Sequence, residues 1–159
     1  MSLPFSADEL RQHIQHDTQH CQALLALLNR EQDALKKRDA EQVEAILKQK
    51  TPLIEAFEKS LKRRQDWASK ANMRCDEEAW STLLAKLNAS DIAETWTELK
   101  QLYRRVHEQN DINGRLLSRH QSTAKRMLDI LRGKTAGPNL YTANGYSSNR
   151  ADRNNIGEA

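Results

Sequence analysis

Apolar residues recur at every third or fourth position along most of the run from Ser90 to Gly133. The members of this stripe are Ile92, Trp96, Leu99, Tyr103, Val106, Leu117, Ala124, Met127 and Leu131. This period places side chains on one face of a long α-helix, which must be buried against other helices. Asn110 and Asn113 occupy two steps of the stripe, and Gly114 follows them. Polar residues at such steps are typical of a register-setting position or a partner site.

A similar stripe predicts a long helix at the start of the chain. Ser6 and Glu9 form a capping-box pattern, so this helix is expected to run from Ala7 to Arg38. Its apolar positions are Leu10, Ile14, Cys21, Leu24, Leu25, Leu28 and Leu35.

A second long helix is predicted directly after the first. Asp39 followed by Gln42 indicates its start. The apolar positions are Val43, Ile46, Leu47, Leu53, Ile54, Phe57 and Leu61. Because this stripe stays in phase across Pro52, we expect one kinked helix that continues to Ala71 rather than two helices.

Asp76 can cap a short third helix that carries Trp80, Leu83, Leu84 and Leu87, and Ser90 begins the last long helix. Short turns between long helices make neighbours antiparallel. We therefore expect an all-α, antiparallel up-and-down helical bundle of long helices, formed by residues 1–133. Residues 134–159 are rich in Gly, Asn, Ser and Asp, and this composition predicts a mobile C-terminal tail.

Composition and charge narrow the function classes. The formal net charge of +3 is too small to indicate a nucleic-acid surface, and the basic clusters 36–38 and 62–64 lie among acidic residues. The longest apolar run, Ala23 to Leu28, is too short to span a membrane. Cys21 and Cys75 have no paired spacing, which favours free thiols in a reducing compartment. We therefore expect a cytoplasmic protein without nucleic acid binding or membrane insertion.

Candidate chemistry is sparse. His13, His16 and His20 are three or four residues apart, with Cys21 adjacent, and imidazoles on one helix face can ligate zinc. No other helix supplies a matching ligand set, so we expect solvated surface histidines and no metal or other cofactor. The chain has no Gly-rich phosphate loop and no recognisable nucleophile–base–acid motif. The sequence therefore predicts a protein that is not an enzyme.

The three tryptophans are expected to serve packing first. Trp96 is in phase with the last stripe, which predicts a place inside the bundle. Trp67 and Trp80 flank a predicted loop and could hold it in place.

Asn110, Asn113 and Gly114 leave two interpretations open. In the first, the asparagines make hydrogen bonds between helices at the edge of the core, and the glycine permits close approach of another backbone. In the second, these residues belong to a groove left open for a helix of another chain. The sequence favours neither.

Several local patterns together are similar to a known family. The first long helix contributes Leu24, Leu25, Glu31 and Leu35, and the second contributes Asp39, Leu47, Lys50 and the run from Leu53 to Leu61. The sharpest match is the run Asn110–Leu117, which reads NDINGRLL, together with Trp96, Leu99, Leu128, Leu131 and Gly133. Leu140, Tyr141 and Gly145 follow. These residues resemble the FlgN family of flagellar type III export chaperones.

The resemblance implies a cytoplasmic, non-catalytic chaperone for the first and third flagellar hook-associated proteins. Such a chaperone holds the amphipathic terminal helices of these subunits until export. The resemblance also implies that the tail tyrosine, which is Tyr141 here, docks on the cytoplasmic domain of the export-gate protein FlhA.

The residue pattern is compatible with this role, because a long helix with an incomplete stripe can cover apolar helices that would otherwise self-associate. The expected client-binding residues are Asn110, Asn113, Gly114, Leu116, Leu117, Leu128 and Leu131. Two alternatives remain: a structural coiled-coil adaptor or self-assembling bundle, and a metal-responsive bundle that uses His13, His16, His20 and Cys21.

Overall fold

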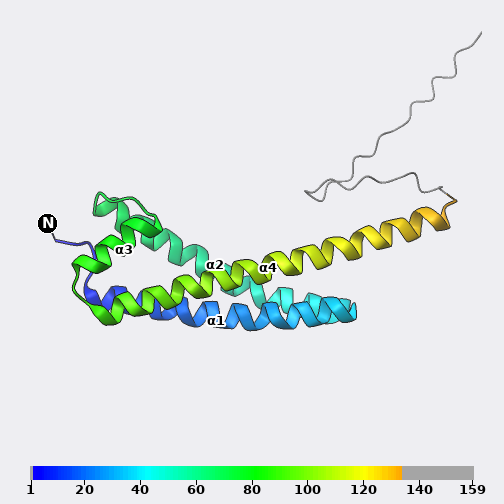
Figure 1. Ribbon diagram of the computed structural model, residues 1–159, viewed down its shortest axis with the longest axis horizontal. Helices are drawn as coiled ribbons and strands as arrows, with labels where there is room; N and C mark the ends of the chain where they lie inside the picture. The colour runs from blue at the N-terminus through cyan, green and yellow to red at the C-terminus, as the bar shows by residue number, and fades with distance from the viewer. Residues whose placement is uncertain (1, 134–159) are drawn as a thin grey trace, which may run out of the picture. The chain divides into compact units, whose positions relative to one another are not determined.

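Four helices form in residues 2–133, the part of the chain that the computed structural model describes (Figure 1). They are α1 (Ala7–Lys37), α2 (Ala40–Lys70), α3 (Glu77–Lys86) and α4 (Ser90–Leu131). These described residues contain no strand, so the predicted all-α class is confirmed. The predicted mobile tail, with Tyr141, lies outside the described residues.

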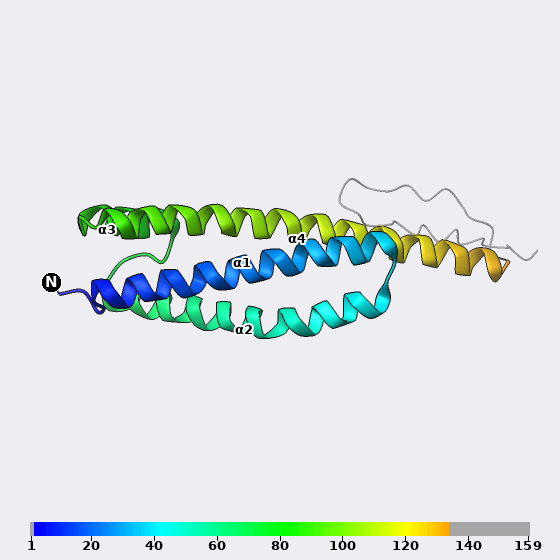
Figure 2. The same ribbon diagram turned by 90° about the horizontal axis from the view of Figure 1, so that it is seen from below.

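The chain falls into two units, Met1–Leu117 and Ser118–Ala159, and α4 continues from the first into the second. Within the first unit, α1, α2 and the first part of α4 lie side by side (Figure 2). The chain runs up α1, down α2 and up again in α4, which is the predicted up-and-down order. The predicted domain boundary after Gly133 stays a prediction.

Side-chain caps define where three of the helices begin. At α1, the Ser6 hydroxyl accepts from Glu9 N at 3.1 Å, and the Glu9 carboxylate accepts from Ser6 N at 2.8 Å. Asp39 caps α2, and Asp76 caps α3 by accepting from Ala79 N at 2.8 Å. Each cap satisfies backbone donors that the first helical turn leaves unpaired. The three predicted starts are therefore confirmed.

Pro52 lies inside α2, and the helix continues through it. The prediction of a single helix across this residue is confirmed. The stripe on α2 is less buried than predicted, since Leu47, Ile54 and Leu61 are 56%, 43% and 47% exposed. These three residues are seven apart, so they share one side of α2, and the rest of the first unit covers that side only in part.

The main core of the first unit gathers at the end where α3 lies. Phe5 packs against Trp67 with ring centroids 4.7 Å apart and against Trp80 at 6.0 Å. Trp67 and Trp80 are thus core residues that hold the connection between α2 and α3. Trp96 is buried in the same cluster, as its phase predicted.

Candidate functional site

The apolar stripe of α4 begins as part of the core. Ile92, Trp96 and Leu99 are buried in the main cluster. Their side chains stabilise the fold and are closed to a partner. A binding surface on α4 must therefore lie further along the helix.

Asn113 ties α4 to α1. Its amide Nδ2 donates to the Leu28 carbonyl at 2.8 Å and to the Glu31 carboxylate at 2.9 Å, and its Oδ1 accepts from Gln109 Nε2 at 3.0 Å. Lys50 from α2 pairs with the same Glu31 carboxylate at 3.2 Å. Asn113 is only 3% exposed and its bonds are satisfied, so in this structure it makes the contact between helices that the packing interpretation requires.

Gly114 and Asn110 differ from Asn113 because both are exposed. A Cβ atom added to Gly114 would meet nothing within 4 Å, so the close backbone approach considered from sequence does not occur among the described residues. Asn110 borders an open cavity of about 300 Å³ whose lining includes Leu24 and Leu28 of α1 and Ile54 of α2. This part of α4 therefore has free space beside it.

Leu116 is half-buried and Leu117 is 45% exposed at the end of the first unit. The second unit carries the largest exposed apolar side chains on α4. We call them the C-terminal apolar face: Met127 at 56% exposed, Leu128 at 49%, Ile130 at 67% and Leu131 at 82%. Met127, Leu128 and Leu131 are three and four residues apart and so share one side of the helix. Four large, exposed apolar side chains within five residues are typical of a binding surface.

Polar side chains also meet inside the first unit, where the sequence predicted none. Asp17 accepts from Ser60 Oγ at 2.6 Å and from Tyr103 OH at 3.1 Å, and the Arg64 guanidinium lies 3.9 Å from the same carboxylate. His13 Nε2 lies 3.1 Å from Ser60 Oγ. These bonds join α1, α2 and α4, which fixes the register of the three helices.

His13 corrects the expectation of surface histidines. It is 6% exposed and packs edge-on against Trp67, because its position on α1 adjoins the apolar residues Leu10 and Ile14. Burial lowers the pKa of His13 to about 4, although the nearby Asp17 carboxylate acts in the opposite direction. The ring is therefore neutral at pH 7.

His13, Ser60 and Asp17 are residue types found in hydrolases, but Ser60 is half-buried and both of its partners, His13 and Asp17, are buried and closed to a substrate. Burial likewise raises the pKa of the Cys21 thiol to about 12, which makes it a poor nucleophile. No group of three or more potential metal ligands occurs within residues 2–133. Among these described residues, the exposed apolar side chains of α4 are the strongest candidate for a functional surface.

The sequence pattern indicated this surface only in part. Leu128 and Leu131 were predicted, whereas Met127 was assigned to the stripe and Ile130 was missed. The signal for Ile130 was its place among four apolar residues in the five positions from 127 to 131. The sequence also missed the buried polar network, although the four-residue step from His13 to Asp17 places both on the buried side of α1.

Comparison with known proteins gives one family. A family model described as FlgN protein matches residues 1–149. No curated protein and no solved structure matches the chain. None of the described helices is long and apolar enough to cross a membrane.

Proposed function

Because the chain belongs to the FlgN family of flagellar export chaperones, we propose that it binds the amphipathic terminal helices of exported flagellar subunits. The subunits are the first and third hook-associated proteins. FlgN is a family of chaperones and not of enzymes, and its members bind flagellar proteins. The observation that carries the proposal is the exposure of Met127, Leu128, Ile130 and Leu131 on one short stretch of α4.

The client helix lies along α4 with its apolar side on this face. A helix-in-groove contact concentrates its binding energy in a few apolar anchors, and burying one Leu side chain contributes about 2 kcal/mol. In the first unit, the proposed client surface also includes Asn110, Gly114 and Leu117, which are exposed on α4. Leu116 contributes its exposed edge, while Asn113 acts indirectly by holding this part of α4 against α1.

Delivery uses a second contact. Tyr141 docks the loaded chaperone on the cytoplasmic domain of the export-gate protein FlhA. The support for this step is the match of Tyr141 to the tail tyrosine of the family. Because Tyr141 is ten residues further along the chain than Leu131, the two contacts use different side chains, and the chaperone can hold its client while it engages the gate.

The test of client binding is a double substitution, Leu128→Asp with Leu131→Asp. Two charges on the contact should weaken binding of either hook-associated protein by about 100-fold or more, because buried anchors dominate such contacts. Titration calorimetry measures the affinity, and circular dichroism verifies that the helices persist. The control is Leu47→Asp, which adds a charge at a leucine of similar exposure on α2. Equal losses in both variants, or no loss in the first, would reject this location of the site.

Self-assembly is the second candidate function. Leu47, Ile54 and Leu61 form an exposed row at seven-residue spacing on α2, and such rows pair helices in coiled coils. Sedimentation of the pure chain tests this. Two results together would favour assembly over export. The chain would form a stable oligomer that dissociates on a substitution in this row, such as Ile54→Asp, and it would have no affinity for hook-associated proteins.

A further inference from the structure

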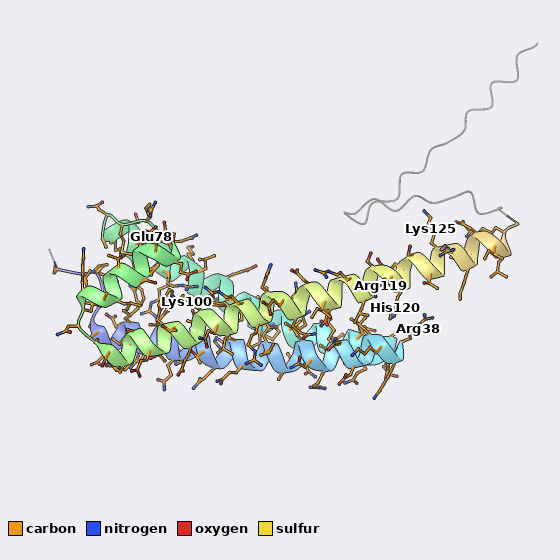
Figure 3. The ribbon with its side chains drawn as sticks, in the orientation of Figure 1. Arg38, Glu78, Lys100, Arg119, His120 and Lys125 are labelled. Carbon is orange, nitrogen blue, oxygen red and sulfur yellow. The ribbon has the colours of Figure 1, made fainter. Side chains whose placement is uncertain are left out.

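The C-terminal apolar face lies in a basic segment of the described chain. Residues 118–133 contain Arg119, Lys125, Arg126 and Arg132 but only one acidic residue, Asp129. Their net charge is +3, equal to the formal charge of the whole chain, so the remaining residues sum to zero. All four basic side chains are exposed, and none makes an ion pair within residues 2–133. Arg119 and Lys125 stand out from the ribbon of α4 (Figure 3).

The four cations are arranged in two rows. At 100° per residue, Lys125 and Arg132 are seven apart and border the side of the face that holds Leu128. Arg119 and Arg126 are also seven apart and lie on the opposite side. Arg126 is next to Ile130, whereas Arg119 lies 11 residues before Ile130, about 16 Å along the helix axis. Asp129 lies between the two rows, on the side of the helix away from the apolar residues. The apolar face is therefore flanked by positive charge along both edges.

The helix dipole does not account for this pattern. Cations stabilise a helix only when they lie within its last turn, near the unpaired carbonyl groups. Arg119, Lys125 and Arg126 are five or more residues before the end of α4 at Leu131. Their positions correspond instead to the residues that flank an apolar contact in paired helices, where charge selects the partner and its orientation.

We propose that this face selects a client helix that carries acidic residues on both sides of its apolar stripe. The inference rests on the proposed function, because it describes the client of the same surface. A second copy of the chain does not fit. Both edges of the face are positive, so two copies would place like charges opposite each other in either the parallel or the antiparallel orientation.

The test compares two synthetic helical peptides with the full chain. Both peptides have three heptads with Leu at the two core positions of each heptad. One peptide carries Glu, and the other Lys, at the two positions of each heptad that flank the core. We expect the Glu peptide to bind at least about tenfold more tightly at low ionic strength, since several flanking pairs act together. The difference should shrink as NaCl is raised. Equal affinities would overturn the proposal.

A charge reversal locates the effect. Arg119→Glu with Arg126→Glu should remove or invert the preference for the Glu peptide. The matched control is Lys59→Glu with Lys62→Glu, which changes the charge equally at exposed lysines of α2. If the control changes the preference as much, the effect comes from net charge rather than from this face, and the proposal is wrong. Circular dichroism establishes that each variant keeps its helices.

Two further arms separate this proposal from other partners and from the proposed function. Phosphatidylcholine vesicles with phosphatidylserine that compete fully with the Glu peptide would assign the face to membranes instead. Suppose that the native chain binds both peptides equally and that the Leu128→Asp, Leu131→Asp variant binds neither. This result would leave the proposed function intact and reject the acidic client. A charge preference for peptides in a chain that does not bind hook-associated proteins would reject the proposed function alone.

Discussion

The two ends of α4 carry apolar residues at the same helical period, but their surroundings differ. Ile92, Trp96 and Leu99 are enclosed by the main core of the first unit. Leu128 and Leu131, in the second unit, are 49% and 82% exposed. The same pattern therefore has two outcomes: the first stretch contributes to the stability of the fold, whereas the second leaves its apolar side chains exposed. Helical period alone does not separate them, because it identifies a face and not what covers it.

The sharpest way to break this comparison is to shorten one leucine from each end. Leu99→Ala should lower the free energy of unfolding by about 3 to 5 kcal/mol, because Leu99 is fully buried and its loss leaves a cavity. Leu128→Ala should change it by no more than about 0.5 kcal/mol, as expected for a surface residue. Urea unfolding followed by circular dichroism measures both. Similar losses in the two variants would show that the C-terminal apolar face belongs to the fold.

Tyr141 tests whether client and gate contacts are separate. Tyr141→Ala should leave client affinity unchanged and weaken binding to the cytoplasmic domain of FlhA by about 2 kcal/mol, the usual effect of removing an aromatic anchor. The measurement is a pair of titrations, one against a hook-associated protein and one against the FlhA domain.

Tyr146→Ala is the matched control, since it removes the same side chain five residues further along. Gate binding that depends on Tyr146 and not on Tyr141 would contradict the assignment. A loss of client affinity in Tyr141→Ala would show that the two contacts are not independent.

The fold was predictable because its signals are local. Ser6, Asp39 and Asp76 each bond to backbone donors within three residues, so a short stretch of sequence contains the whole cap. The burial of Trp96 could be predicted from its place in the apolar stripe of α4 alone.

The site was less predictable because burial depends on what other helices supply. Leu47 and Leu99 each occupy a regular position in the apolar stripe of their helix. Leu47 is nevertheless 56% exposed, whereas Leu99 is fully buried. His13 lies on the apolar side of α1, but its polar partner, Ser60, comes from α2, and this contact joins residues 47 positions apart. The two interpretations of Gly114 stayed open because a glycine in sequence does not reveal which backbone, if any, approaches it.

The buried polar network, through His13, makes the stability of the first unit depend on pH. The pKa of His13 is lowered to about 4 in the folded protein, whereas a histidine in the unfolded chain has a pKa of about 6.5. Between these values the unfolded state binds more protons. The contribution of the neutral, buried His13 to the free energy of unfolding is thus fully present above pH 6.5 and is lost as the pH falls toward 4. The free energy of unfolding should be about 1 kcal/mol lower at pH 5.5 than at pH 7.5.

His13→Gln supplies the comparison, because it keeps a polar side chain but removes the titrating ring. Its urea midpoint should vary less with pH over the same window. His16→Gln is the control, since His16 is exposed on the same helix. If His13→Gln retains the full pH dependence, another group is responsible, and the buried position of His13 is not what couples folding to protons.

The smallest expected change lies between the two ends, at Gly114. A Cβ atom there meets nothing within 4 Å, and alanine favours a helix by up to about 1 kcal/mol relative to glycine. Gly114→Ala should therefore raise the free energy of unfolding slightly. The informative measurement is client affinity in this more stable variant. A drop would indicate that the glycine leaves room for the backbone of a client, so that the partner surface begins at Gly114. Unchanged affinity would confine the contact to later residues of α4, and the glycine would then have no role in binding.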